Sequence, residues 1–475
     1  MNAFKKIFTV MCVAIYMSSL FAASPAQALT ISEEEELGRE FFKYVQQRYR
    51  FADDPFVRHY IESLGRRLAA AFPDPMFEYR FFIVDDETYN AFAAPAGYVF
   101  VNSGLIQAMN SESELAGILT HEIAHVYCRH ISEKIEKSKK IGLATLAGIA
   151  AGIFLGAGGA VPGDAVMIGS AAAGQAAALA YSREDERQAD QIGVTYLCHA
   201  GYSAAGLMEI LKKIKSKQWF SDKEFPTYLS THPGTDERLM YIDTLMASPD
   251  FAACSRKDAD DEQSFAVVKT KIMAFYPGDS AAIRKFSGLV QQEPDNALAR
   301  YGLGLALCQN NRHADAIAHF QKVAQNSFAY PHAQTALGEA YYYTGAYEKA
   351  LATLERVPAA DAYYDTERYF YTAMAAEKLG IHEKSTALFR QIIQKEPQYL
   401  PAIYELGKAE GERGNLEDAH FYLGIYHNNR REPDTALFHL NKAMELTRDE
   451  KRKEQIKKML ADIQEFLKEQ RRSMR

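Results

Sequence analysis

The stretch Thr120-His121-Glu122-Ile123-Ala124-His125-Val126 lies in the middle of a strongly helical pattern. Two imidazoles four residues apart on a helix lie about 40° apart around its axis and one turn apart along it, so both can bind one metal ion. Glu122 occupies the adjoining arc, where it can act on a metal-bound water without being a ligand. This H-E-x-x-H arrangement is the zincin signature, and it predicts one Zn²⁺ per chain.

The predicted metal-binding helix begins with a capping box. Ser111 and Glu114 have the required S-x-x-E spacing, and the helical pattern continues to about Lys139. Cys128 falls on the same face as His121 and could approach the metal, but its distance along the axis favours a packing role. His130 points about 180° away, which indicates a supporting or surface residue and not a ligand.

A catalytic zinc site needs a third protein ligand, and the acidic segment 182–190 can supply it. Glu186 and Asp190 are four residues apart, so on a helix one carboxylate can bind zinc while the other orients a ligand histidine. Glu184 lacks such a partner because Gln188 occupies the equivalent position. A solvated charge cluster is the alternative, and the H-E-x-x-H sequence makes it the less favoured one.

The segment Thr231-His232-Pro233-Gly234 is followed by Arg238. A histidine held by the following proline could face the cleft, either as an oxyanion donor or as a reversible fourth metal ligand. An ordinary surface His-Pro turn is an equally good interpretation of the residues alone. Both interpretations therefore stay open for His232 and Arg238.

The region before the metal-binding helix combines helices with short strands. Apolar spacing predicts helices over 31–49 and 55–71, and β-rich runs predict strands over 77–84 and 98–102. Between the strands, the small residues of 90–97 predict a loop at a substrate-facing rim, with an ordinary turn as the alternative.

These motifs together resemble the gluzincin family that includes the integral-membrane prenyl-protein proteases and the heat-shock membrane proteases. The resemblance covers roughly residues 31–250 and is closest to the soluble, exported branch. It implies that His121, His125 and Glu186 bind zinc, that Glu122 is the general base, and that Asp190 supports a ligand. Ala96 departs from the family, which usually has glycine there, so a close approach of substrate to that backbone is less certain.

The first 28 residues are typical of a signal peptide. Lys5 and Lys6 precede an apolar core, and Ala26-Gln27-Ala28 forms an A-x-A cleavage site, so cleavage is expected after Ala28. Four cysteines follow, sparse and far apart, which predicts isolated thiols and not a disulfide framework. The formal net charge of −7 argues against a nucleic-acid partner, because no basic excess exists to neutralise phosphates.

An uncharged, Gly/Ala-rich segment covers 141–161 and is followed by another small-residue segment to 181. Its length would suit a membrane span, but glycine and alanine supply little driving force for insertion. A spanning segment would also separate His121 and His125 from Glu186. We expect a helical hairpin over 141–181 that acts as a lid or makes a peripheral membrane contact.

The C-terminal half repeats itself. Small residues recur at intervals of 34, 35 and 34 at Ala316, Ala350, Ser385 and Ala419, and apolar residues follow four positions later at Phe320, Leu354, Phe389 and Leu423. This period is the signature of the tetratricopeptide repeat, a pair of helices that stacks into a solenoid. A basic amphipathic helix over 448–475 is expected to close the stack.

The predicted fold is mainly α with a small β-sheet: an α+β zincin domain followed by an all-α solenoid. The expected boundaries are a signal peptide over 1–28, a zinc metallopeptidase domain over 29–250, a linker over 251–262, and a repeat domain with a capping helix over 263–475.

The predicted function is zinc-dependent hydrolysis of peptide bonds in protein substrates that the repeats select or present. Glu122 would act as base, with Asp190 in support and His232 and Arg238 at the oxyanion. The combination of leader, protease and repeats resembles periplasmic quality-control proteases of Gram-negative bacteria. That resemblance implies unfolded or stalled outer-membrane proteins as substrates and the outer-membrane assembly machinery as a partner of the repeats. The alternative is a chaperone or adaptor with a latent or inactive protease site.

Overall fold

A computed structural model describes residues 29–137, 181–220, 227–249, 251, 261–276, 279–358 and 365–473. The chain divides into two compact units, the first ending at Phe265 and the second beginning at Ala266, with Asp54–His59 counted in the second. The predicted signal peptide, nearly all of the Gly/Ala-rich segment and most of the predicted linker lie outside the described residues. Within the described ranges, no helix is long and apolar enough to cross a membrane.

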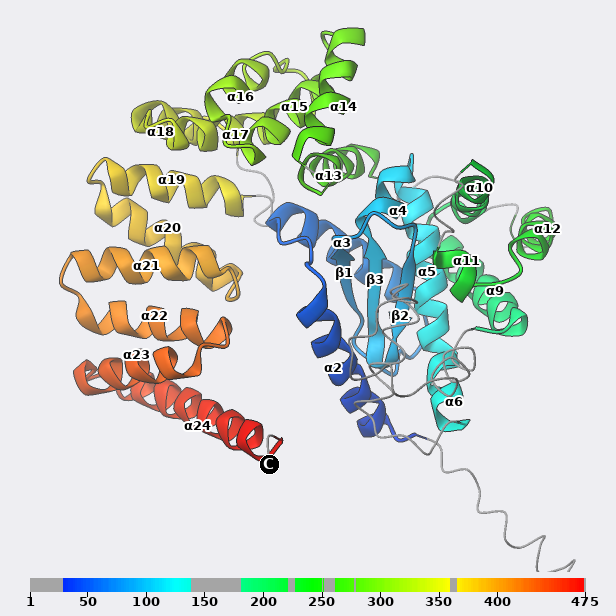
Figure 1. The fold of residues 1–475 in the computed structure, drawn as a ribbon, viewed down its shortest axis with the longest axis horizontal. Helices are drawn as coiled ribbons and strands as arrows, with labels where there is room; N and C mark the ends of the chain where they lie inside the picture. The colour runs from blue at the N-terminus through cyan, green and yellow to red at the C-terminus, as the bar shows by residue number, and fades with distance from the viewer. Residues whose placement is uncertain are drawn as a thin grey trace, which may run out of the picture. The chain divides into compact units, whose positions relative to one another are not determined.

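The first unit combines helices with one small sheet (Figure 1). Its strands and the 3-10 turn η1 lie between the second and third of its described helices in the chain. The elements are α2 (Ile31–Arg48), α3 (Pro55–Ala69), β1 (Arg80–Val84), β2 (Ala91–Ala94), η1 (Pro95–Gly97), β3 (Tyr98–Asn102), α4 (Ser103–Ala108), α5 (Glu112–Tyr127), α6 (His130–Lys137), α9 (Arg183–His199), α10 (Ala205–Phe220), α11 (Thr227–Thr231) and α12 (Thr235–Met246).

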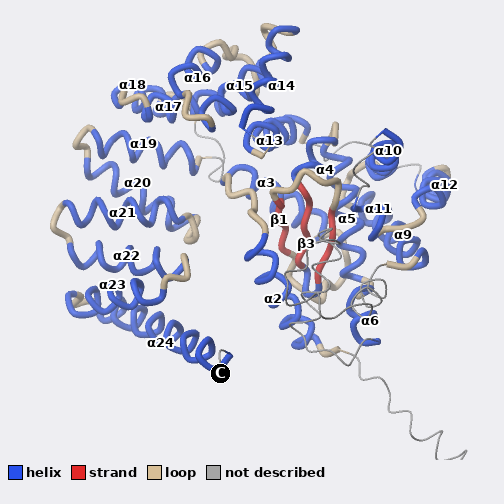
Figure 2. Tube along the Cα trace, viewed as in Figure 1, coloured by secondary structure: helices blue, strands red, loops and turns tan. Residues whose placement is uncertain are grey.

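The sheet has the order β1-β3-β2, shown in red in Figure 2. β1 pairs with β3 in parallel, with Phe82 opposite Phe100, whereas β2 pairs with β3 in antiparallel, with Phe92 opposite Phe100. The expectation of a loop over 90–97 was therefore wrong in part, since 91–94 is an edge strand. Phe41 of α2 packs against Phe92 and Phe100, with ring centroids 6.1 and 6.0 Å apart, and so joins α2 to the sheet.

The metal-binding helix is shorter than the sequence predicted. Ser111 caps α5 by accepting a hydrogen bond from the Glu114 amide, as expected, but α5 ends at Tyr127 and α6 begins at His130. Arg129 between them has a φ of 56°, a left-handed conformation that breaks the helix. Arg129 is held there by Glu34, whose Oε2 lies 2.7 Å from its Nη2.

The second unit is a stack of helix pairs. Its helices are α13 (Glu262–Phe275), α14 (Asp279–Gln292), α15 (Ala297–Gln309), α16 (His313–Phe320), α17 (Tyr330–Tyr343), α18 (Tyr347–Glu355), α19 (Thr366–Lys378), α20 (His382–Lys395), α21 (Leu400–Glu412), α22 (Leu416–Asn429), α23 (Pro433–Leu446) and α24 (Glu450–Ser473). α13 begins four residues before the second unit, which starts at Ala266. The structure confirms the predicted fold class, which is mainly α with a small sheet and a helical repeat array.

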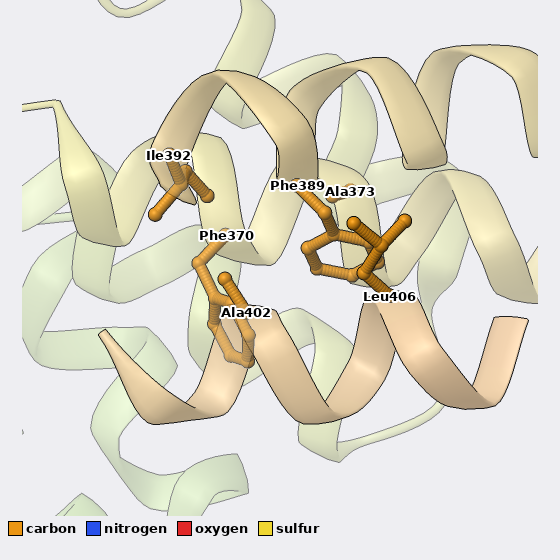
Figure 3. Close-up of a cluster of buried hydrophobic side chains, with 6 residues drawn as sticks. All are labelled: Phe370, Ala373, Phe389, Ile392, Ala402 and Leu406. Atoms are coloured by element: carbon orange, nitrogen blue, oxygen red, sulfur yellow. The ribbon is translucent and has the colours of Figure 1, made fainter. Parts of the chain in front are cut away.

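The repeat period determines the core of the stack. Figure 3 shows one such cluster, in which residues of three successive helices meet: Phe370, Ala373, Phe389, Ile392, Ala402 and Leu406. Phe389 is one of the residues that recur in the sequence, and its side chain is fully buried. Each helix pair thus buries its apolar face against the next pair.

One cysteine contradicts the expectation of isolated thiols. Cys198 in α9 is disulfide-bonded, whereas Cys128 and Cys308 are free. A disulfide requires two Cα atoms within about 7 Å of each other, and the spacing of four scattered cysteines does not reveal such proximity.

Candidate metal centre

Helix α5 places His121, Glu122 and His125 in the interior of the first unit. All three side chains are at most 1% exposed, and α5 runs beside the sheet and α9 (Figure 1). The Nε2 atoms of His121 and His125 lie 3.0 Å apart. This close approach of two buried imidazole nitrogens is what a shared metal ion requires.

Helix α9 brings the two carboxylates to these histidines. Ser182 caps α9 in a capping box with Asp185, so the helix begins one turn before Glu186. Glu186 Oε2 lies 3.5 Å from His121 Nε2, and its Oε1 lies 3.5 Å from His125 Nε2. Gly193 permits this approach, because a Cβ there would lie 3.3 Å from the Cα of His121.

Hydrogen bonds fix the tautomer of each α5 histidine. Asp190 Oδ1 lies 2.8 Å from His121 Nδ1, which donates to it and leaves Nε2 as a free acceptor. His125 Nδ1 lies 2.9 Å from His130 Nδ1, and His130 Nε2 lies 3.0 Å from Gln188 Oε1. Since the Gln188 oxygen only accepts, His130 donates through Nε2, and its Nδ1 accepts from His125. When both α5 histidines are neutral, as metal binding requires, each would therefore present an unprotonated Nε2 to the same point.

Arg238 of α12 joins the two carboxylates of α9. Its Nε and Nη2 donate to Asp190 over 2.7 and 2.8 Å, and its Nη1 lies 2.6 Å from Glu186 Oε2. The Arg238 side chain is only 2% exposed. The guanidinium thus occupies the carboxylate side of the site, and its bidentate bond to Asp190 fixes how far α12 lies from α9.

His232 completes a four-residue cluster. One ligand atom from each of His121, His125, Glu186 and His232 lies within 4.8 Å of the others, and all four residues are buried. His232 Nδ1 contacts the Thr231 hydroxyl over 2.9 Å, so its Nε2 is the nitrogen available to the site. The Nε2 atom lies 3.5 Å from Glu122 Oε1.

Several buried polar atoms of the cluster lack hydrogen-bond partners among the described residues. These are both carboxylate oxygens of Glu122, Oε1 of Glu186, and Nε2 of His232, whereas Oε2 of Glu186 is paired with Arg238. Buried polar groups normally form hydrogen bonds, so unpaired atoms that converge on one point indicate a missing ligand. Two imidazoles and a carboxylate are the usual donors of a catalytic zinc site, so these residues fit a zinc ion.

Burial and charge shift the pKa values of the cluster strongly. Burial raises the pKa of Glu122 to about 8, and the Glu186 carboxylate adds to the effect, whereas His121 and Arg238 oppose it. Burial and Arg238 tend to lower the pKa of His121, but Asp190 and Glu186 outweigh them and hold it at about 9. Burial, followed by the charge of neighbouring histidines, lowers the pKa of His125 well below its usual value.

Tyrosines that the sequence did not single out line the same site. Tyr181 stacks on His125 with ring centroids 3.7 Å apart, and Tyr228 stacks on His232 at 4.2 Å and 11°. The Tyr241 hydroxyl donates to Asp190. Their only sequence signal was proximity to the motifs, since Tyr181 directly precedes Ser182. Cys128, for which the sequence favoured a packing role over an approach to the metal, is outside the cluster.

Comparison with known families agrees with both units. Residues 55–246 match peptidase family M48, and residues 280–333 and 308–375 match tetratricopeptide repeats. Among solved structures, the crystal structure of MamA aligns with 33% of this chain and 91% of that chain at 20% identity, with a TM-score of 0.30.

Three curated relatives represent the proteins that this chain resembles. A putative β-barrel assembly-enhancing protease of Vibrio cholerae is 32% identical over 44% of this chain and 43% of that protein. The β-barrel assembly-enhancing protease of Yersinia pestis is 27% identical over 62% and 60%, respectively. The mitochondrial metalloendopeptidase OMA1 of Schizosaccharomyces pombe is 24% identical over 45% and 61%. The chain thus spans about half the length of the curated relatives it matches.

Proposed function

Because residues 55–246 form a peptidase family M48 domain and tetratricopeptide repeats follow it, we propose that the chain is a zinc-dependent endopeptidase whose repeats select or present protein substrates. The observation that carries the proposal is the buried cluster of His121, His125, Glu186 and His232, whose ligand atoms lie within 4.8 Å of one another. Among these atoms, Glu186 Oε1 and His232 Nε2 have no hydrogen-bond partner in the described residues.

The proposed zinc ligands are His121, His125 and Glu186. A bound zinc ion would polarise the scissile carbonyl and acidify the attacking water. Asp190 keeps His121 in the tautomer that offers Nε2, and His130 does the same for His125. Both histidines are thus oriented in advance by a supporting hydrogen bond.

Glu122 is the proposed general base. Its carboxylate is buried, accepts no hydrogen bond of normal geometry from the described residues, and lies beside the ligand atoms. It would take a proton from the attacking water and pass it to the amine that leaves. An edge strand can pair with an extended peptide, so β2, whose Ala93 backbone interacts with Glu122, is the proposed place for the substrate backbone.

Arg238 takes a different role from the one expected. Its guanidinium is paired with Asp190 and Glu186, so we assign it to positioning these carboxylates and not to the oxyanion. His232 is the remaining candidate for the oxyanion, and it is also close enough to be a fourth ligand. As a fourth ligand it would occupy the open position of the zinc and hold the protease latent, which favours the alternative of a chaperone or adaptor.

The names of the relatives support a role in outer-membrane protein assembly. We propose that the substrates are unfolded or stalled outer-membrane proteins, that the repeats contact them or the assembly machinery, and that the chain works in the periplasm after cleavage behind Ala28. The proposed domain limits remain 29–250 for the peptidase and 263–475 for the repeats. A peripheral membrane contact through 141–181 also remains a proposal, because only Tyr181 of this segment is described.

The test uses the full mature chain with casein and an unfolded outer-membrane protein as substrates. Glu122→Gln is expected to lower the cleavage rate at least about 100-fold while zinc stoichiometry stays unchanged. Glu184→Gln, on an exposed position of α9, is the matched control. Equal cleavage by wild type and Glu122→Gln would refute the enzymatic proposal.

Two further variants separate the roles of the ligands. Glu186→Gln should lose zinc, and stoichiometric zinc in that variant would transfer the third-ligand role to His232, the other member of the cluster. His232→Ala distinguishes latency from catalysis: the cleavage rate rises if His232 blocks the open position, and it falls if His232 stabilises the oxyanion.

A further inference from the structure

The backbone of Leu29 is held between α6 and the break that precedes it. The Leu29 nitrogen donates to Glu136 Oε1 over 2.6 Å, and the Leu29 carbonyl accepts from Arg129 Nη2 over 2.9 Å. These two bonds join positions about one hundred residues apart in the chain. They lie directly after Ala28, where the A-x-A pattern predicts leader cleavage.

Among the described residues, Leu29 lies beside two carboxylates and one cation. Glu34 and Glu136 both pair with Arg129, and their side chains are only 1% and 18% exposed. Glu34 is also bound by the Ser132 hydroxyl over 2.6 Å. Three other charged residues, on α2 and α6, have other contacts or are exposed. Lys134 binds Asp185, Glu33 caps Thr30, and Glu133 faces solvent.

We infer that cleavage behind Ala28 creates a cation at Glu136, the carboxylate to which the Leu29 nitrogen already donates. Hydrolysis of the Ala28–Leu29 bond adds one water, leaves a carboxylate on Ala28, and turns the Leu29 nitrogen into an amine that takes up a proton at neutral pH. The new ammonium group already lies at Glu136. Two carboxylates then face two cations, and the neutral hydrogen bond becomes a charge-assisted one.

The docked terminus lies beside the residue that breaks the metal-binding helix. The Arg129 side chain donates a hydrogen bond to the Leu29 carbonyl. Arg129 has the left-handed φ of 56° and directly precedes His130. His130 in turn contacts His125 Nδ1 over 2.9 Å. Processing would therefore stabilise the break that aims His130 at His125, and this last step rests on the proposed zinc site, whereas the docking itself does not.

The experiment compares three full-length proteins that differ only at the amino terminus. One begins at Leu29, one retains Ala28, and one begins at Leu29 but is acetylated on its α-amino group. N-terminal sequencing of protein exported in cells first establishes the natural start. The chain that begins at Leu29 is expected to melt several degrees higher than the other two and to release zinc several-fold more slowly.

Two controls make the result specific. Glu136→Gln should remove the difference in melting temperature between the three proteins, whereas Glu133→Gln should preserve it. Acetylation tests the charge without altering α6, so the comparison remains decisive even if Glu136→Gln folds poorly.

The pH dependence supplies a further readout. The α-amino group has a pKa of about 8 in the unfolded chain, and pairing with Glu136 raises this pKa in the folded protein. The added stability is therefore present below pH 8 and is lost as pH rises through the pKa of the folded state. A natural start other than Leu29, or equal melting temperatures for free and acetylated termini, would overturn the inference. Neither readout depends on protease activity, so failure of the proposed function is seen separately.

Discussion

Oδ1 of Asp190 lies 2.8 Å from Nδ1 of His121, and both side chains are completely buried. Four residues earlier on α9, Glu186 is paired with Arg238 through Oε2, while its Oε1 accepts no hydrogen bond from the described residues. One turn of helix thus separates a carboxylate that holds a histidine from a carboxylate that is available to a metal ion. Helix α9 therefore supplies both a candidate metal ligand and a residue that orients a ligand histidine.

Asp190→Asn is expected to weaken zinc binding about 10- to 100-fold, the usual effect of removing a hydrogen bond that supports a ligand. The amide cannot hold Arg238 by charge, and it can turn its NH₂ group towards His121. Competition with a chromogenic chelator measures the affinity. Glu184→Gln on the exposed side of α9 should bind zinc like wild type, and an unchanged affinity in Asp190→Asn would contradict the assignment.

His130→Leu should have a smaller effect at the second histidine. His125 Nδ1 would lose its acceptor, so the tautomer that offers Nε2 would no longer be favoured. We expect zinc affinity to fall several-fold, about 10-fold at most. His382→Leu in the repeats, where the side chain is 47% exposed, serves as the control. If both variants bind zinc equally, His130 has no part in orienting His125.

Ala96 has a φ of 62°, a conformation that costs an L-residue about 1–2 kcal/mol. Glycine avoids this cost, although it loses more entropy on folding and removes a buried methyl group. Ala94 lies two residues earlier, is also buried, at 0% exposed against 8% for Ala96, and has a φ of −111°. Ala96→Gly should therefore destabilise the protein by about 1 kcal/mol less than Ala94→Gly does in urea unfolding. Equal losses would show that no strain is present at Ala96.

The metal-free protein should become less stable as pH rises from about 6.5 to 9. The pKa of Glu122 is raised to about 8 and that of His121 to about 9, so in this range the native state binds more protons than the unfolded state. The stability that these two groups contribute is fully present below their pKa values in the unfolded state. It is lost as pH rises through their pKa values in the folded state. The lowered pKa values of His125 and His232 act only below about pH 6.5.

Urea unfolding of chelator-treated protein across this range measures the slope. Glu122→Gln should make the decline shallower, because its side chain no longer titrates. A decline as steep in Glu122→Gln as in wild type would mean that the Glu122 carboxylate is already ionised in the native metal-free pocket.

The motifs predicted the residues of the cluster, but the sequence could not specify all of its contacts. His121, His125 and Glu186 lie together, and His232, which the sequence left undecided between the cleft and an ordinary turn, lies with them. The break at Arg129 was missed because a left-handed arginine is determined by tertiary partners, here Glu34, and not by a local stop signal. His130 was consequently placed on the wrong side of the helix, although its supporting role was considered.

The edge strand β2 illustrates a different limit. Ala91-Phe92-Ala93-Ala94 has weak β-propensity, and it becomes a strand because β3 supplies hydrogen-bonding partners along its length. The repeat array, in contrast to β2, could be predicted from the sequence alone. The interval set by Ala316, Ala350, Ser385 and Ala419 is local and regular, so the helix pairs could be predicted without tertiary information.

Arg238 neutralises much of the charge of Glu186 and Asp190 before any metal is present. The pocket therefore does not depend on zinc to keep two buried carboxylates together, and folding can precede metal uptake. For a chain that folds after export, zinc loading then becomes a separate, late and reversible step. Whether a given molecule is competent for cleavage would depend on the zinc supply of its compartment as well as on correct folding.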